Sequence, residues 1–378
     1  LGGLAGLSWN LQYAQENRTG LRPYGGSFGF GNVVEIAETI DYRTSSAEIR
    51  GEWNTKSAGV QFGYRHSIFE NDISTMYWDN PFRITDGTDG RAYLAPGGAS
   101  INGAATGFAD LYPDNEADHL FVNGRGRIGG WWAQGSLVVG SMSQDDPLLP
   151  YTLNTAIDGV DFDGSEFDAT DPANLPVRNA DLDVDTLTFN GDAGTTFADR
   201  FHLAFKLRYY DYDNGSPRIE FPGYVRYHGV WEEIPRVTVP YSYTRDTAGV
   251  SFEWEVTGDH DLELYYDRNA WDREFRETEK TEEDVVGLRW DGRFGSDLTV
   301  RAGYETGDRT IEGEYLTEAQ EFSFLDPAGI NNQPGLRKFL QAEREYDEVD
   351  ARVQWYPSDT MDFAFFVVGR DEDYPGSQ

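Results

Sequence analysis

The feature that most constrains this chain is an alternation of apolar and polar residues that recurs along most of its length. In residues 298–302 (LTVRA) every second side chain is apolar, and residues 201–208 and 349–355 follow the same pattern. Successive side chains of a β-strand point to opposite faces, so each such segment predicts a strand with one apolar and one polar face. No segment shows a clear helical period, and we therefore predict an all-β protein.

The alternation predicts about thirteen strands. Many of them have about 10–14 residues, which is longer than the ~5–6 residues of a typical globular strand and suits tilted strands that cross a membrane. We place them near residues 4–16, 42–54, 58–70, 118–128, 131–144, 182–191, 200–212, 243–256, 261–276, 283–293, 297–309, 343–356 and 360–371.

Short and long connections alternate between these strands. Short turns are predicted at residues 55–57, 129–130, 258–260, 294–296 and 357–359. Long polar loops are predicted near residues 17–41, 71–117, 145–181, 213–242 and 310–342. Outer-membrane barrels have this arrangement, with tight periplasmic turns and long outer loops. We therefore predict that residues 1–378 form a single antiparallel transmembrane β-barrel domain, large and porin-like, in the bacterial outer membrane.

Counting the strands predicts that the chain is part of a larger barrel. If the short turns are periplasmic, the first and the last of about thirteen strands both run outward, whereas single-chain bacterial barrels have an even number of strands. Residues 371–378 would then lie in an outer loop. We expect further strands to come from outside this sequence.

Composition excludes several classes of protein. The chain has 31 Lys+Arg against 66 Asp+Glu, a formal net charge of −35, and a nucleic-acid partner would need a basic surface. It has no cysteine, which excludes disulfides, Cys-ligated zinc and covalent c-type haem on this chain. The longest apolar run, residues 363–369, is far shorter than the ~18–20 residues of a membrane-spanning helix.

Several short motifs occur in a fixed order along the chain. Residues 39–44 read TIDYRT before a predicted strand, and residues 69–74 (FENDIS) lead to Trp78-Asp79-Asn80-Pro81-Phe82. Further motifs lie at residues 113–117, 140–146, 336–347 and 357–377. In order and spacing these stretches resemble the MtrB/PioB family of outer-membrane barrels associated with decahaem cytochromes. The family has proline where this chain has Thr39.

The resemblance implies a porin-like sheath for an electron conduit. A periplasmic multihaem c-type cytochrome would be inserted in the lumen, a second multihaem cytochrome could dock outside, and electrons would cross the outer membrane through the partner's haems. The chain itself would carry no cofactor and would not be an enzyme. Two alternatives stay open: a general diffusion porin or transporter, and a soluble all-β enzyme or carbohydrate-binding protein.

The two faces of the predicted strands have different expected contacts. Apolar positions such as Leu203, Phe252 and Val300 would face lipid, with Trp and Tyr near its edges. Polar positions would line the lumen, either gripping the cytochrome through charge-assisted hydrogen bonds or forming the ion pairs that line water in any porin. The candidate partner-facing residues are Arg50, Arg65, Arg125, Arg127, His202, Lys206, Arg208, Arg289, Arg301 and Arg352.

Residues 145–185 are a candidate calcium-binding loop, because they contain eleven acidic residues against Arg178 alone. Hard cations such as Ca²⁺ favour carboxylate oxygens. The segment does not fit the EF-hand pattern, since Gly164 comes too early and Pro172 occupies the position of the bidentate Glu. A solvated acidic loop is the alternative. The calcium candidates are Asp158, Asp161, Asp163, Glu166 and Asp168.

We predict no catalytic site. The five histidines include no HExxH motif or other close pair, so the sequence gives no support for a catalytic zinc site. No nucleophile-elbow, P-loop or dinucleotide-binding motif occurs in a suitable context.

Overall fold

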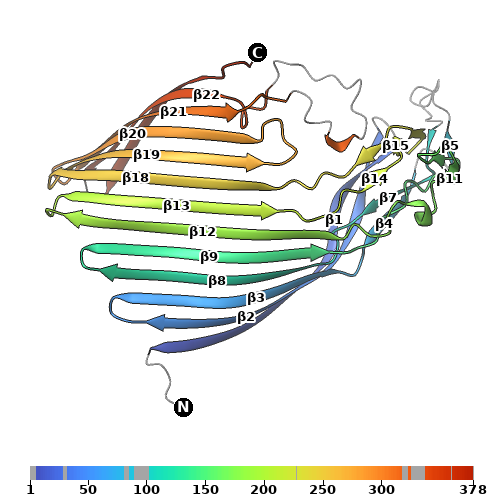
Figure 1. Cartoon of the computed structure of the whole chain (residues 1–378), viewed down its shortest axis with the longest axis horizontal. Helices are drawn as coiled ribbons and strands as arrows, with labels where there is room; N and C mark the ends of the chain where they lie inside the picture. Colours follow the sequence, from blue (N-terminus) through green and yellow to red (C-terminus); the bar gives the residue numbers. More distant parts are fainter. Residues whose placement is uncertain are drawn as a thin grey trace.

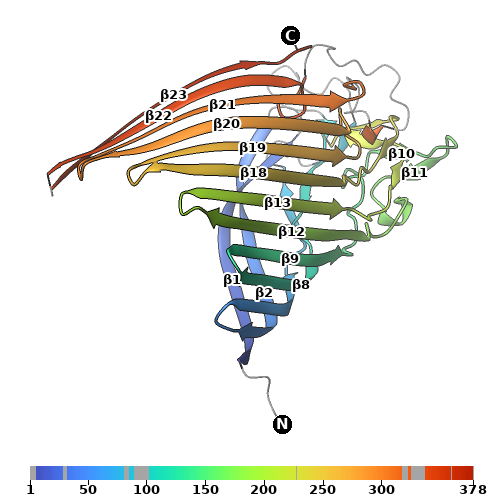
Figure 2. The same ribbon diagram turned by 60° about the vertical axis from the view of Figure 1, so that its left-hand side comes forward.

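One curved antiparallel sheet of 13 strands forms most of the protein (Figures 1 and 2). The computed structural model describes residues 6–28, 32–80, 85–88, 102–226, 228–316, 322–324, 337–358 and 360–377. The sheet strands are β1 (Leu7–Phe28), β2 (Asn32–Asn54), β3 (Ala58–Asn71), β8 (Asn115–Ile128), β9 (Trp131–Gln144), β12 (Leu182–Phe197), β13 (Phe201–Asp213), β18 (Tyr243–Thr257), β19 (His260–Arg273), β20 (Lys280–Phe294), β21 (Leu298–Glu312), β22 (Arg344–Ser358) and β23 (Met361–Asp373). Each pairs with the next in this order. The described residues contain no helix long and apolar enough to cross a membrane.

The prediction of an all-β fold with an antiparallel sheet is confirmed, and each predicted strand overlaps one strand of the sheet. The sheet stays open, with β1 and β23 at its two edges. Eight strands suffice to close a small barrel, so a 13-stranded sheet that is still open has the curvature of a much wider one.

The prediction of an outer loop at residues 17–41 is wrong. β1 and β2 instead form one long hairpin whose register runs from the pair Leu7–Trp53 to the pair Phe28–Asn32. The alternation of apolar and polar residues is weak in this region of the sequence. Tertiary contacts support the two strands there. The Tyr24 ring packs against the indole of Trp78 at 5.9 Å between centroids.

The turn between β12 and β13 is also tighter than predicted. β12 continues to Phe197, six residues beyond its expected end, and residues 198–200 make the connection. Ala198 and Asp199 have φ values of 50° and 55°. The backbone N–H of Arg200 donates to the carbonyl oxygen of Phe197 at 3.4 Å, which makes Ala198 and Asp199 the central residues of the turn. A turn of the I′ kind needs positive φ at both central residues, so this turn matches the twist of the flanking strands. It lies at the same end of the sheet as the other short turns.

The long loops carry their own hairpins and gather at the opposite end of the sheet (Figures 1 and 2). Their paired strands are β4 (Thr75–Asp79) with β7 (Thr106–Asp110), β5 (Gly87–Thr88) with β6 (Asn102–Gly103), β10 (Asp158–Val160) with β11 (Glu166–Asp168), β14 (Glu220–Phe221) with β17 (Arg236–Val237), and β15 (Tyr224–Arg226) with β16 (Val230–Glu232). Of the predicted loop 310–342, residues 317–321 and 325–336 lie outside the described residues, as do Pro81 and Phe82.

Asn154 joins three of these loops. Its side chain is fully buried, and its Nδ2 donates to the carbonyl oxygens of Gly87 at 3.1 Å and His228 at 2.9 Å. Its Oδ1 accepts from the backbone N–H of Ala156 at 3.1 Å. Nearby, Trp231 packs edge-on against the ring of Tyr151 at 5.1 Å between centroids, and burial raises the pKa of Tyr151 to about 12. The loops therefore form one packed layer.

Replacing Asn154 by alanine should loosen this layer. The change removes two hydrogen bonds to partly buried carbonyl groups, each of which contributes about 0.5–1.5 kcal/mol. We expect faster cleavage of the outer loops by protease added to intact cells, with no change in the amount of barrel in the membrane. Asp158→Ala, a change at an exposed residue of the same loop, is the control. Equal cleavage of both variants would contradict the assignment of Asn154 as the joining residue.

Candidate functional site: the polar wall

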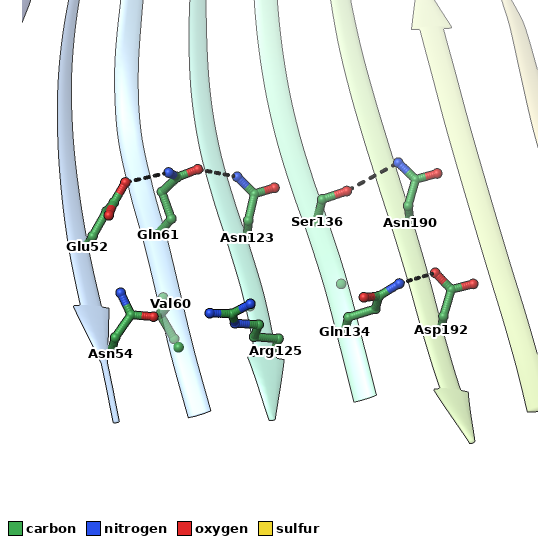
Figure 3. Close-up of a pocket in the computed structure, with 13 residues that line it drawn as sticks. Glu52, Asn54, Val60, Gln61, Asn123, Arg125, Gln134, Ser136, Asn190 and Asp192 are labelled. Atoms are coloured by element: carbon green, nitrogen blue, oxygen red, sulfur yellow. Dashed lines mark hydrogen bonds between the residues drawn. The ribbon is translucent and has the colours of Figure 1, made fainter. Parts of the chain in front are cut away.

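A row of hydrogen-bonded polar side chains crosses the sheet near the short turns (Figure 3). Gln61 donates to Glu52 at 2.9 Å and accepts from Asn123 at 3.1 Å. On the next two strands Asn190 donates to the hydroxyl of Ser136 at 3.2 Å. These groups line a shallow hollow of about 430 Å³ that spans β2, β3, β8, β9 and β12. The polar side chains of consecutive strands therefore lie on one face.

This polar face is the concave, lumenal face of the sheet. At the loop end of the sheet, loop residues cover it. Tyr42 and Arg309 lie on the same face as the polar row by strand alternation and are buried by loop residues. Tyr42 contacts the ring of Tyr112, and Arg309 donates to the carbonyl oxygens of Ala342 and Leu340 at 2.7 and 3.3 Å.

The register places all ten candidate partner-facing residues on the polar face, and seven of them are paired with carboxylates. Arg65 and Arg50 share Glu48, at 2.6 and 3.4 Å. His202 Nε2 lies 2.9 Å from Glu255. The other pairs, with distances of 2.7–3.1 Å, are Lys206–Asp267, Arg208–Asp192, Arg289–Glu263 and Arg301–Asp291.

The structure shows no ion pair for the remaining three candidates among the residues that it describes. Arg125, Arg127 and Arg352 have no carboxylate partner within ion-pair distance in the described part of the chain. Asp192 and Asp267, two of the partner acids, are not among the candidates predicted from the sequence. Asp267 lies within the predicted strand 261–276, where the alternation places it on the polar face, whereas Asp192 lies just beyond the predicted end of strand 182–191. Only the folded sheet shows which cation each acid meets.

Bulky side chains on the polar face lie flat along the wall. Tyr265 on β19 lies over Gly287 of β20, and Tyr346 on β22 lies over Gly307 of β21, so closely that a Cβ at either glycine would collide with the ring. Both phenols donate to Glu305 between them, Tyr265 at 2.6 Å.

The same arrangement recurs on the other half of the sheet. Trp132 lies over Gly194 and Phe121 over Gly63, in each case close enough that only glycine fits beneath the ring. All four glycines occupy lumen-facing positions in the register. Large aromatic side chains thus cover the wall without projecting from it.

The opposite face of the sheet is apolar and exposed. Phe205, Leu264, Val286 and Val349 are 42–58% exposed on it. Toward the loop end, tyrosines on this face donate to carboxylates of the next strand, as Tyr266 does to Asp284 at 2.5 Å and Tyr304 to Asp347 at 2.6 Å. Tyr64 makes the same bond to Asp118.

An apolar band that ends in aromatic residues with polar tips is the lipid-facing surface of an outer-membrane barrel. The tyrosines would sit at the outer interface, where the phenol ring meets lipid and its hydroxyl meets the polar layer. Acidic residues lie just beyond them, outside the hydrocarbon.

The structure does not gather the five calcium candidates into a metal site. Asp158 and Glu166 lie in the β10–β11 hairpin, and no group of three or more metal-ligating side chains occurs in the described residues. Two of the acids instead bond to their own loop: hydrogen bonds from Ser165 and from Thr170 lower the pKa values of Asp163 and Asp168. The acids stabilise turns of a solvated loop, and we do not propose calcium binding.

A curved antiparallel sheet with a lipid-facing apolar exterior, a polar concave face and loops at one end defines an integral outer-membrane β-barrel. Comparison with known proteins agrees: residues 5–378 match the model of the family described as outer membrane beta-barrel porin, MtrB/PioB. The chain belongs to the MtrB/PioB family. This is a porin family and not an enzyme family.

One relative and two solved structures illustrate the similarity. The outer membrane protein MtrB of Shewanella baltica (strain OS185) is 24% identical over 368 residues, which cover 97% of this chain and 46% of that protein. Two variants of the FrpB iron transporter of Neisseria meningitidis, F3-3 and F5-1, match with TM-scores of 0.51 and 0.50 at 10% and 11% identity. They cover 98% and 97% of this chain but 50% and 51% of theirs, and they support the fold alone.

These findings exclude one of the alternatives considered for the class of protein. The location in the outer membrane rules out the soluble all-β protein. The chain spans about half the length of the curated relative that it matches.

Proposed function

We propose that this chain forms part of a sheath that holds a multihaem c-type cytochrome and so supports electron transfer across the outer membrane. The family resemblance suggests the partner. The observation that carries the proposal is the flat polar wall, in which Trp132, Tyr265 and Tyr346 lie over glycines of neighbouring strands. A wide lumen whose bulky side chains do not project leaves room for a folded protein and offers it hydrogen-bonding groups.

The chemistry divides between the two proteins. Covalent c-type haem needs a CxxCH motif, and this chain has no cysteine, so the haems would belong to the partner. The barrel would supply an apolar exterior with closed strand pairing toward lipid, which keeps the partner and its water out of the hydrocarbon. An extracellular cytochrome would meet the packed loop layer that Asn154 joins.

Purification of the native-length protein from its outer membrane in a mild detergent tests the proposal. We expect c-type haem absorbance to migrate with the barrel through size-exclusion chromatography, at a constant ratio across the peak. A barrel free of haem that also makes lipid vesicles permeable to ions and small sugars would contradict the proposal and would instead indicate a diffusion porin.

A further inference from the structure

Arg125 and Arg127 are two of the three candidate cations of the wall, with Arg352, that have no carboxylate partner in the described residues, and they are the two that lie together. They lie two residues apart on the lumenal face of β8, just before the Gly129-Gly130 turn, and both are exposed. Neither has a carboxylate partner in the described part of the chain. In Figure 3 the guanidinium of Arg125 lies in the hollow between Asn54 and Gln134, with no bond to either.

Their surroundings explain why they are unpaired. The residues directly across from Arg125 are Gly59 on β3 and Gln134 on β9, and the residue across from Arg127 on β9 is Trp132. No neighbouring strand therefore places a carboxylate opposite either arginine.

The two carboxylates that share the hollow are engaged by other groups. Glu52 accepts from Gln61 at 2.9 Å. Asp192 accepts from Arg208 at 2.8 Å and from Gln134 at 3.3 Å. The donor groups of the Arg125 and Arg127 side chains are thus left to water or to a ligand.

Unpaired arginines are unexpected here, because acidic residues outnumber basic ones 66 to 31. Elsewhere on the wall Arg50, Arg65, Arg289 and Arg301 all meet a carboxylate. A guanidinium presents a planar fork of donors that fits a carboxylate in a bidentate manner. Two such groups on one face, with amide side chains beside them, are complementary to an acidic surface.

The position in the barrel selects the occupant. The hollow lies toward the short turns, since Asn54, Arg125 and Gln134 line it. These turns face the periplasm in an outer-membrane barrel. The loops gather at the other end of the sheet (Figure 1). A protein that enters the lumen from the periplasm would pass the two arginines first.

We propose that Arg125 and Arg127 form the docking site for surface Asp or Glu side chains of the protein held in the lumen. This inference rests on the proposed function and names the part of the wall that recognises the partner. The guanidinium groups supply charge-assisted hydrogen bonds, while Gln134 and Asn54 supply neutral donors beside them.

The test compares two double variants of the native-length barrel that remove the same charge. R125Q/R127Q changes the site, and R43Q/R268Q removes two arginines from the opposite face. We expect R125Q/R127Q to lower the ratio of c-type haem to purified barrel at least tenfold after a wash in 0.3 M NaCl, and R43Q/R268Q to leave the ratio within twofold of wild type. R125K/R127K should give an intermediate ratio, because lysine keeps the charge but not the fork.

A second measurement does not depend on retention. A photo-crosslinking amino acid at position 125 should label an Asp- or Glu-rich peptide of the partner. Wild-type haem content in R125Q/R127Q, equal loss in both double variants, or cross-links only to neutral or basic peptides would overturn this inference and leave the proposed function intact. A wild-type barrel that carries no haem would overturn both.

Discussion

Replacing Phe205 by arginine should destabilise the barrel by about 2–4 kcal/mol, the usual effect of a cation at the middle of the lipid-facing surface. Phe205 lies midway along the apolar face of β13, opposite Ala193 and Val250, and is 42% exposed there. Both residues across from this position are apolar, so an arginine there would have no carboxylate opposite it.

The matched control is the preceding residue, Ala204, which faces the lumen. Ala204 lines a concave hollow of about 630 Å³ together with Ser251 and Glu263, so an arginine there meets water and acids. We expect A204R to change stability by less than about 1 kcal/mol. Urea titration of the native-length barrel in lipid vesicles, with heat-modifiable mobility as the folding assay, measures both. Equal destabilisation by the two variants would contradict the assignment of the faces.

Filling the glycine positions beneath the lumenal tyrosines should abolish partner capture while leaving the barrel in the membrane. In G287L/G307L the rings of Tyr265 and Tyr346 can no longer lie flat, and they must turn into the lumen. We expect at least a tenfold fall in the haem that purifies with the native-length barrel, because a folded partner cannot adjust to two projecting aromatic rings.

The control is Gly124→Leu, since a side chain added at Gly124 meets nothing within 4 Å. That variant should keep the wild-type ratio of haem to barrel. The amount of heat-modifiable barrel in the outer membrane should be similar in all three proteins. A G287L/G307L barrel that retains haem would show that the flat wall is not needed to hold the partner.

The strands and their faces were predictable from sequence because strand geometry is local. Side chains alternate with a period of two whatever the strand is paired with, so residues 298–302 and 349–355 identify both an apolar and a polar face. The same parity placed all ten candidate cations on the lumenal face.

Features that depend on contacts between distant segments were not predictable. The outer parts of β1 and β2 were expected to be a loop, because their alternation is weak. They pair as strands, and Trp78 of another loop packs against Tyr24 there. The hydrogen bonds that Asp163 and Asp168 accept within their own loop also depend on how that loop folds.

The sequence by itself determined a β-barrel exterior, a polar interior and an acidic loop layer, since periodicity and composition depend on residues close together in the chain. Only the tertiary structure decided which charges neutralise each other. Arg208 and Arg125 look alike in sequence, yet in the folded sheet Asp192 lies diagonally across from Arg208 and pairs with it, whereas Gly59 and Gln134 lie across from Arg125. Cross-strand pairing joins residues far apart in the chain, and for that reason only the folded sheet shows which arginines of the wall have no carboxylate partner among the described residues.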